Sequence, residues 1–237
     1  VYTESDNGKF KKNALEAASY AHKLAEQLGT SVTAITINMA DSEVIGTYGV
    51  SKILKVTNDK LSIFNAKAYA TTIAQAAQNE GASTIVVSSS TDTKYMAAIL
   101  AGILNAGYCT NVVAPPLSTN PLVVKRTAFS NKGFAHTKYK TATNIIGVSN
   151  NAYGIFENKL SPQLEDFEPS LTDADFSVQS LNIDKVVGKA TIADADIVVS
   201  GGRGLKGPEN WGMIEELAEV LGAATACSKP VSDMGWR

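Results

Sequence analysis

The amino-acid sequence predicts an α/β protein with a Rossmann-like open sheet, mostly parallel with an antiparallel extension, followed by the start of a second α/β unit. Two observations support this fold class. β-Branched segments alternate with helical patterns of about 10–15 residues in the first half of the chain, which is typical of βαβ units in a parallel sheet. The same alternation resumes at Asp196. We therefore expect two domains, 1–184 and 185–237, of which the second is incomplete.

The first half of the chain supplies the alternating strands and helices. The expected strands are Val1–Glu4, Ser31–Ile37, Lys52–Val56 and Ser83–Val87, and the expected helices are 14–28, 66–80 and 95–105, with a weak helical turn at 41–48. Gly29 and Gly81 stand where a glycine that ends a helix belongs. Residues 96–104 read MAAILAGIL. Because this segment is apolar almost all round, we expect its helix to be well buried.

The pattern changes after the next expected strand, Cys109–Val113. Three β-prone segments follow with turn residues between them, and we expect them to form the antiparallel extension: Leu122–Phe129, Gly133–Lys140 and Asn144–Ser149. The chain then becomes acidic over 157–175, and Phe176–Leu181 offers one more strand. We expect residues 182–194 to connect the two domains.

The second unit opens with a strand that runs into glycines. Ile197–Ser200 is apolar enough for a buried strand, and Gly201–Gly204 follows it as a tight turn. Pro208 suits the first turn of a helix over 209–221, which Gly222 would end. Ala223–Cys227 is the next expected strand. A single strand–helix–strand unit lacks neighbouring strands, so we expect the chain to stop within a domain.

Composition excludes several classes of function. The chain has 237 residues, 44% of them hydrophobic, and a net charge of −2. It therefore has no overall positive field to hold a nucleic acid or an anionic membrane. Cys109 and Cys227 lie far apart, which argues against a disulfide framework and favours a reducing compartment. No apolar run reaches the about 20 residues of a membrane-spanning helix.

The most informative stretch for chemistry is 197–206, IVVSGGRGLK. A glycine-rich turn between a strand and a helix directs backbone N–H groups at one spot, where phosphate oxygens bind well. Gly202 and Gly204 would let the backbone approach a ligand, and Arg203 would add a charged contact. The alternative is an ordinary tight turn with a solvated arginine.

Ser228 and Lys229 follow the next expected strand. Ligands in open α/β sheets bind beyond the carboxyl ends of the strands. If the two strands are neighbours, these residues and Arg203 meet in one crevice.

Residues 198–236 carry a resemblance to a known family. They read VVSGGRGLKGPENWGMIEELAEVLGAATACSKPVSDMGW and resemble the opening of the flavin domain in the alpha subunit of electron transfer flavoproteins. The order VSGGRGL, GAA, SR and D-x-G-W is characteristic of that family, and Lys229 stands here in place of its arginine. A looser resemblance extends over the whole chain.

The resemblance implies an electron carrier that is not itself an enzyme. It also implies a location in the bacterial cytoplasm or the mitochondrial matrix, of which we expect the bacterial cytoplasm. It implies FAD as the cofactor, with Arg203 and Ser228 among its contacts and Lys229 as a cation that favours the reduced flavin. The implied partners are a beta subunit, acyl-CoA or other flavin dehydrogenases that donate electrons, as in fatty acid beta-oxidation, and a quinone oxidoreductase that accepts them. Because most family contacts to the flavin would lie beyond Arg237, we expect these 237 residues alone to hold little or no FAD.

The residues also leave a second hypothesis open. The N-terminal domain could bind an adenine nucleotide, or act as an interaction module, without any redox role. Ser5–Gly8, after the first strand, holds only one glycine, which disfavours a phosphate loop there. Ser88–Thr93 precedes a helix and could cap it or cradle an anion, and we expect the cap. His22 and His136 lack partners at metal-ligand spacing, so we expect no metal.

Overall fold

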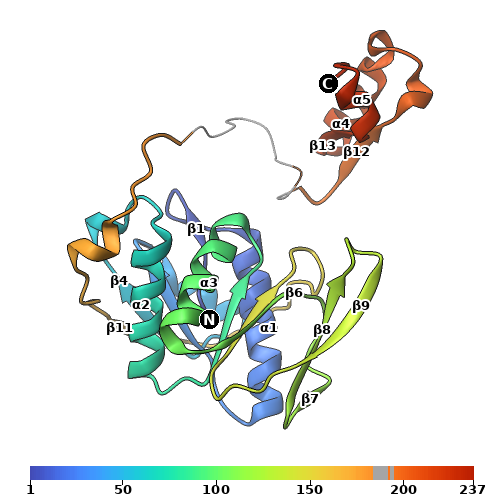
Figure 1. Ribbon diagram of the computed structural model, residues 1–237. Coiled ribbons are helices and arrows are strands. Elements are labelled where there is room, and N and C mark those ends of the chain that lie inside the picture. Colours follow the sequence, from blue (N-terminus) through green and yellow to red (C-terminus); the bar gives the residue numbers. More distant parts are fainter. Residues whose placement is uncertain (184–191, 193–194) are drawn as a thin grey trace. The chain divides into compact units, whose positions relative to one another are not determined.

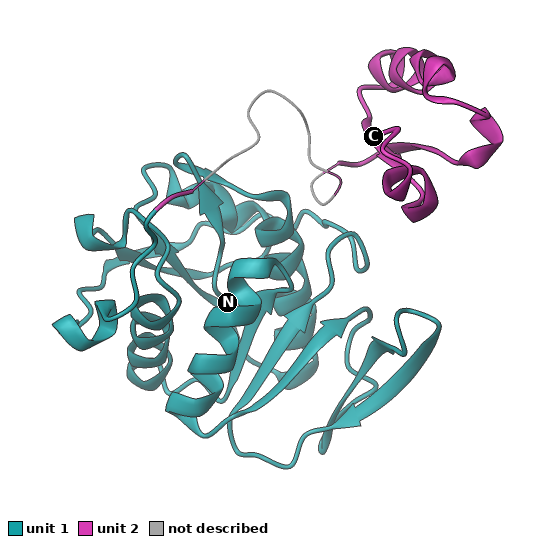
Figure 2. Ribbon diagram, turned by 45° about the horizontal axis from the view of Figure 1, so that its top comes forward, with its two compact units in different colours: residues 1–181 teal, residues 182–237 magenta. Residues whose placement is uncertain are grey.

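The computed structural model describes residues 1–183, 192 and 195–237. The chain divides into two compact units, Val1–Leu181 and Asn182–Arg237 (Figure 2). The expected connector, 182–194, lies largely outside the described residues. None of the helices in the described part of the chain is long and apolar enough to cross a membrane.

Unit 1 contains most of the strands of the molecule (Figure 1). A parallel group has the order β11-β4-β3, and a mixed group has the order β5-β10-β6-β8-β7, with β9 paired to β8. The bounds are β3 Thr33–Ile37, β4 Lys52–Val56, β5 Thr84–Ser88, β6 Gly107–Val112, β7 Ser118–Thr119, β8 Leu122–Ala128, β9 Gly133–Lys138, β10 Asn144–Val148 and β11 Gln163–Asp166.

The N-terminal segment joins these two groups of strands. The Tyr2 N–H donates to the Val86 carbonyl of β5 at 3.0 Å, and the Thr3 N–H donates to the Ile35 carbonyl of β3 at 3.2 Å. Residues 1–4 therefore lie between β5 and β3 in the sheet, with Tyr2 bridging to Ile35; the sequence predicts a strand at these residues but not its central place. The strand order reverses here, since β3 and β4 lie on one side and β5 on the other. Such a reversal is where open α/β sheets bind ligands.

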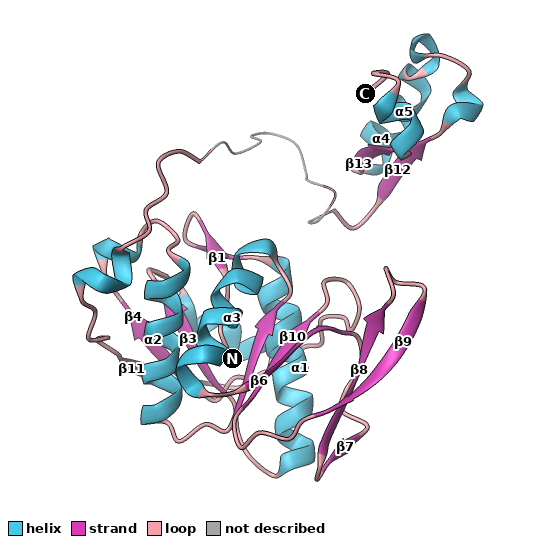
Figure 3. Cartoon of the chain, in the orientation of Figure 1, coloured by secondary structure: helices cyan, strands magenta, loops and turns pink. Residues whose placement is uncertain are grey.

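Helices cover both faces of this sheet (Figure 3). Their bounds are α1 Lys12–Leu28, α2 Ala66–Asn79 and α3 Thr91–Leu104. Tyr20 of α1 packs in one core cluster with Ile146 of β10, whereas Leu100 of α3 packs in the other cluster with Ile145. Adjacent residues of a strand point to opposite faces, so α1 covers one face and α2 with α3 covers the other. Gly29 ends α1 with a φ of 65°, as its sequence position predicts.

Two expectations for unit 1 are wrong in detail. β10 does not belong to the antiparallel extension, because it pairs in parallel with β5 and β6. All five of its residues are buried, which is the pattern of an interior parallel strand. α3 begins four residues earlier than predicted and is not buried all round, since Tyr95 is 67% exposed and Ile103 is 45% exposed. Only one side of α3 faces the sheet.

Three further segments of unit 1 differ from expectation. Phe176–Leu181 forms no strand; a short 3-10 turn spans Asp173–Phe176 instead. The strand of this region is β11, within the acidic stretch, and it extends the sheet beside β4. The loop after the first strand folds as a small hairpin of β1 (Ser5–Asp6) and β2 (Lys9–Phe10).

Unit 2 is a small strand–helix–strand unit. Its elements are β12 Val198–Gly201, the 3-10 turns Arg203–Leu205 and Pro208–Asn210, α4 Gly212–Leu221, β13 Ala224–Cys227 and α5 Lys229–Asp233. β12 was expected to be buried, yet Val198 is 40% exposed. Among the described residues β12 pairs only with β13, so its other edge has no strand to cover it.

Candidate functional site

The two loops of unit 2 that the sequence singles out meet at one edge. β12 and β13 are parallel neighbours, with Gly201 opposite Cys227 at their carboxyl ends. The Ser228 N–H donates to the Gly201 carbonyl at 3.0 Å. The turn that holds Arg203 and the turn that holds Ser228 therefore begin side by side, which confirms that the two strands are adjacent.

Packing requires a glycine at Gly201 of the first loop but not at Gly202 or Gly204. A Cβ on Gly201 would lie 2.5 Å from the Trp211 ring and 2.8 Å from Leu205, so the fold itself requires glycine there. A Cβ on Gly202 would meet only the Ser228 hydroxyl, at 4.0 Å, and one on Gly204 would meet nothing within 4 Å. Packing within the described chain therefore leaves room for a side chain at Gly202 and Gly204.

Arg203 opens the 3-10 turn that follows β12, and its side chain is exposed. The first N–H groups of a helical turn have no partner inside the turn, so they are available to an acceptor. A guanidinium, backbone N–H groups and the Ser228 hydroxyl make a donor set that suits phosphate oxygens. The residues present thus fit the pyrophosphate of a dinucleotide.

Lys229, which directly follows Ser228, has an ion pair of its own. Its ammonium pairs with Asp233, one turn further along α5, at 3.0 Å, and 85% of its side chain is exposed. An exposed pair of this kind is weak, so the lysine can exchange Asp233 for another anion at little cost. In the sequence, the spacing of four residues between Lys229 and Asp233 on one helix indicates this pair.

Arg237 contacts the helix that follows the Arg203 turn, and the sequence analysis did not single it out. Its guanidinium lies 5.6 Å from the centre of the Trp211 ring and pairs with Glu215 of α4. The Trp211 ring in turn packs against Gly201. The spacing of these residues in the sequence does not indicate their contact, because the contact depends on how the strand and helices between them fold.

At the carboxyl ends of the strands, where the strand order of unit 1 reverses, the chain's own polar groups pair with one another. Glu4, which is 4% exposed, pairs with the Lys11 ammonium at 2.5 Å and accepts a hydrogen bond from the Ser88 hydroxyl at 2.9 Å. Burial lowers the pKa of Lys11, but its hydrogen bond to Glu4 and the negative charges of Glu4, Asp92 and Asp6 together outweigh this, so the pKa of Lys11 is raised. The buried Glu4 carboxylate would repel the negative charge of a nucleotide phosphate at this position.

Neighbouring polar residues have structural roles. The Ser90 hydroxyl accepts the Thr93 N–H at 3.1 Å and caps α3, as the sequence predicts. Burial raises the pKa of the Cys109 thiol, which makes it a poor nucleophile. Within the described residues, no group of three or more His, Cys, Asp or Glu side chains could hold a metal ion.

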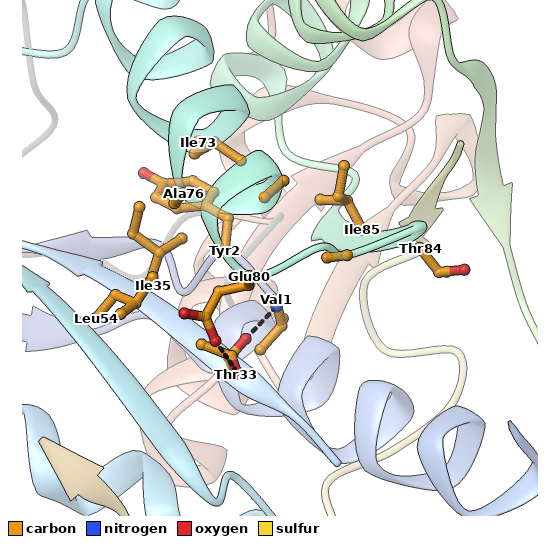
Figure 4. Close-up of a pocket in the computed structure, with 12 residues that line it drawn as sticks. Val1, Tyr2, Thr33, Ile35, Leu54, Ile73, Ala76, Glu80, Thr84 and Ile85 are labelled. Atoms are coloured by element: carbon orange, nitrogen blue, oxygen red, sulfur yellow. Dashed lines mark hydrogen bonds between the residues drawn. The ribbon is translucent and has the colours of Figure 1, made fainter. Parts of the chain in front are cut away.

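A small cavity lies at the opposite, amino end of the unit 1 strands (Figure 4). Its lining is mostly apolar, with Tyr2, Ile35 and Ile85 around it and the Thr33 hydroxyl donating to Glu80 at 3.1 Å. Its volume of about 50 Å³ is far below the about 300 Å³ at which ligand pockets begin. It is too small for a nucleotide or a flavin.

Comparison with known proteins places both parts of the chain in one family. The family model described as "Electron transfer flavoprotein domain" matches residues 1–171, and that described as "Electron transfer flavoprotein FAD-binding domain" matches residues 191–237.

Curated relatives match all or part of the chain. The electron transfer flavoprotein subunit alpha of Thermoanaerobacterium thermosaccharolyticum is 28% identical over all of this chain and 74% of its own length. Protein FixB of Clostridium saccharobutylicum is 26% identical over all of this chain and 73% of its own length. Protein FixB of Bradyrhizobium diazoefficiens is 47% identical over 53 residues, which are 22% of this chain and 14% of its own length. The chain therefore belongs to the electron transfer flavoprotein family and is similar to its alpha subunits over its full length.

Proposed function

We propose that this flavoprotein subunit carries electrons on FAD and converts no substrate of its own. The observation that carries the proposal is the shared edge of β12 and β13, where the Arg203 turn and Ser228 begin side by side. FAD supplies the electron chemistry when it is bound, and the protein supplies orientation and charge. The match of residues 191–237 to the FAD-binding domain supports this assignment.

Five residues of unit 2 have proposed roles toward the cofactor. Gly202 and Gly204 let the backbone approach the pyrophosphate closely, and Arg203 pairs with its oxygens or with the edge of the ring system. Ser228 donates a hydrogen bond. Lys229 exchanges its exposed partner Asp233 for the cofactor and places a positive charge that favours the reduced, anionic flavin.

The partners follow from the family. We propose that the chain works in a heterodimer with a beta subunit, takes electrons from acyl-CoA or other flavin dehydrogenases, and passes them to a quinone oxidoreductase. Bacterial relatives support the bacterial cytoplasm as its location. Fatty acid beta-oxidation is the pathway that these donors indicate.

The domain boundary and the strength of cofactor binding belong to the same proposal. We place the N-terminal domain at 1–184 and the FAD-binding part at 185–237, in line with the two family matches. The described part of unit 2 offers a two-stranded sheet with one ligand edge. Such a small sheet is marginal by itself, so these 237 residues alone are expected to hold FAD weakly.

Substituting Gly202 tests the proposal directly. The structure leaves room for a methyl group at Gly202, so Gly202→Ala should fold normally and still lose FAD, because the methyl group occupies space that the cofactor needs. Gly212→Ala is the matched control, since a Cβ there also meets nothing within 4 Å but lies at the start of α4. Flavin absorbance of the full-length protein purified with its beta subunit is the measurement. Equal flavin content in both variants would contradict the assignment.

A further inference from the structure

The last part of unit 1 is held by the side chains of α2 instead of by strand pairing. The Phe167 N–H donates to the Lys55 carbonyl of β4 at 2.8 Å, and the chain then leaves the sheet. Residues 168–178 cross α2, and Figure 1 shows their 3-10 turn, Asp173–Phe176, beside that helix. Because unit 1 ends soon after this stretch, it leads directly to the residues that join unit 2. We call residues 168–178 the clasp.

One polar stripe of α2 holds the clasp. Lys67, Thr71 and Gln75 are spaced four residues apart and therefore lie on the same side of the helix. The Gln75 side chain donates to the Ser170 carbonyl and accepts from the Ser170 N–H, each at 2.8 Å. The Lys67 ammonium donates to the Ala174 carbonyl at 2.7 Å. We call these three side chains the α2 stripe.

Asp175 connects the turn of the clasp to the α2 stripe. Asp175 is 8% exposed, and its carboxylate accepts a hydrogen bond from the Thr71 hydroxyl at 2.9 Å. The same carboxylate accepts from the Thr172 N–H and from the Thr172 hydroxyl, each at 2.8 Å. The Asp175 N–H in turn donates to the Thr172 carbonyl at 3.0 Å. Because one carboxylate binds both the turn and α2, these contacts should form and break together.

The clasp is anchored more weakly than the sheet. Of its apolar side chains, Pro169 is buried, Leu171 and Phe176 are half-buried, and Val178 is 76% exposed. Its hydrogen bonds to the two ends of the α2 stripe are exposed to solvent, where water competes for the same groups. By contrast, all five residues of β10 are buried. Few buried apolar contacts and exposed hydrogen bonds are typical of a segment that opens locally.

We propose that the clasp opens as one cooperative unit while the sheet of unit 1 stays folded. Opening breaks the contacts with the α2 stripe and adds residues 168–178 to the chain that joins the two units. The clasp therefore sets where unit 1 ends, after Val178 when it is closed and at β11 when it is open. The inference rests on contacts within unit 1 and does not depend on flavin binding.

Native-state hydrogen exchange at increasing urea concentrations, below those that unfold unit 1, tests the opening. The amides of Thr172 and Asp175 report on the clasp, and the amide of Ile146 in β10 reports on the sheet. Since opening of the clasp exposes little surface, the clasp amides should depend on urea much less steeply and exchange at least about tenfold faster without urea. Equal rates with equal urea dependence would overturn the proposal, because the clasp would then open only with the sheet. Clasp amides without protection would overturn it too, because the clasp would then not close.

Gln75→Ala tests whether the clasp acts as one unit. The substitution removes both hydrogen bonds to Ser170 and leaves those between Thr172 and Asp175 in place. The Thr172 amide should still exchange about tenfold faster, because the two sets of contacts open together. Gln78→Ala is the matched control, since Gln78 is exposed on the same helix, and it should change this rate by less than about twofold. An unchanged rate in Gln75→Ala, or an equal increase in both variants, would overturn the proposal.

Discussion

Replacing Glu16 by Gln should destabilise unit 1 more than any ordinary surface substitution. Glu16 lies in α1, is 3% exposed, and accepts four backbone N–H groups of the loop after β10. The donors are Asn151 at 2.8 Å, Ala152 at 2.9 Å, Tyr153 at 2.7 Å and Gly154 at 2.9 Å. Three of them share one carboxylate oxygen, Oε1, and Asn151 binds the other.

The magnitude follows from these bonds. The glutamine oxygen can keep the three bonds to residues 152–154, but its NH₂ group then faces the N–H of Asn151, and two donors cannot bond. An unsatisfied buried donor costs about 1–3 kcal/mol, and the three remaining bonds lose their charge-assisted part. Relief from burying a charge offsets some of this. We expect a loss of about 2–4 kcal/mol in the free energy of unfolding of unit 1.

Native-state hydrogen exchange measures this loss within unit 1. Slowly exchanging amides of β10 should exchange roughly 30- to 700-fold faster in Glu16→Gln, since 1.4 kcal/mol is tenfold. Glu26→Gln is the control on the same helix, because Glu26 is 48% exposed and its pair with Lys23 is worth little. A change below about fivefold in Glu16→Gln would refute the reasoning.

Three other outcomes are expected. Asp175→Asn should lower stability at pH 7 by about 1 kcal/mol, because hydrogen bonds from Thr172 hold the pKa of Asp175 below its usual range. This stabilisation is present above the ordinary Asp pKa and is lost as the pH falls through the lowered value, so urea unfolding of the two proteins should converge in acid; a constant difference would contradict it. Gly201→Val should disrupt unit 2, because its Cβ meets the Trp211 ring, and normal Trp fluorescence would argue against this. Arg203→Ala should weaken FAD binding by about 10- to 100-fold in a flavin titration, since a charge-assisted bond is worth about 1.5–3 kcal/mol; unchanged affinity would remove Arg203 from the site.

The local signals in the sequence predicted most elements of the fold. Lys52–Val56 is a strand to the residue, and Gly29 ends α1. The misplaced segments are those whose position depends on tertiary pairing. β10 was misassigned because short turns around it gave no sign that it inserts between two earlier strands. β11 was missed because its polar residues form a strand only beside β4.

The candidate site was predicted better than the buried polar groups. The adjacency of the Arg203 turn and Ser228 follows from strand–helix–strand order alone. Glu16 escaped notice because the loop it binds lies about 135 residues away in the chain. Its role depends on how α1 packs on the sheet, and a pattern in the sequence does not carry that information.

The central claim is that the edge of β12 and β13 holds FAD in a heterodimer. Its most direct test is the visible absorbance spectrum of the full-length protein purified together with its beta subunit, with the released cofactor identified by chromatography. The account predicts one FAD per heterodimer and much less on the isolated 237 residues. A colourless heterodimer, or one that keeps its flavin in Arg203→Ala and Gly202→Ala alike, would contradict it.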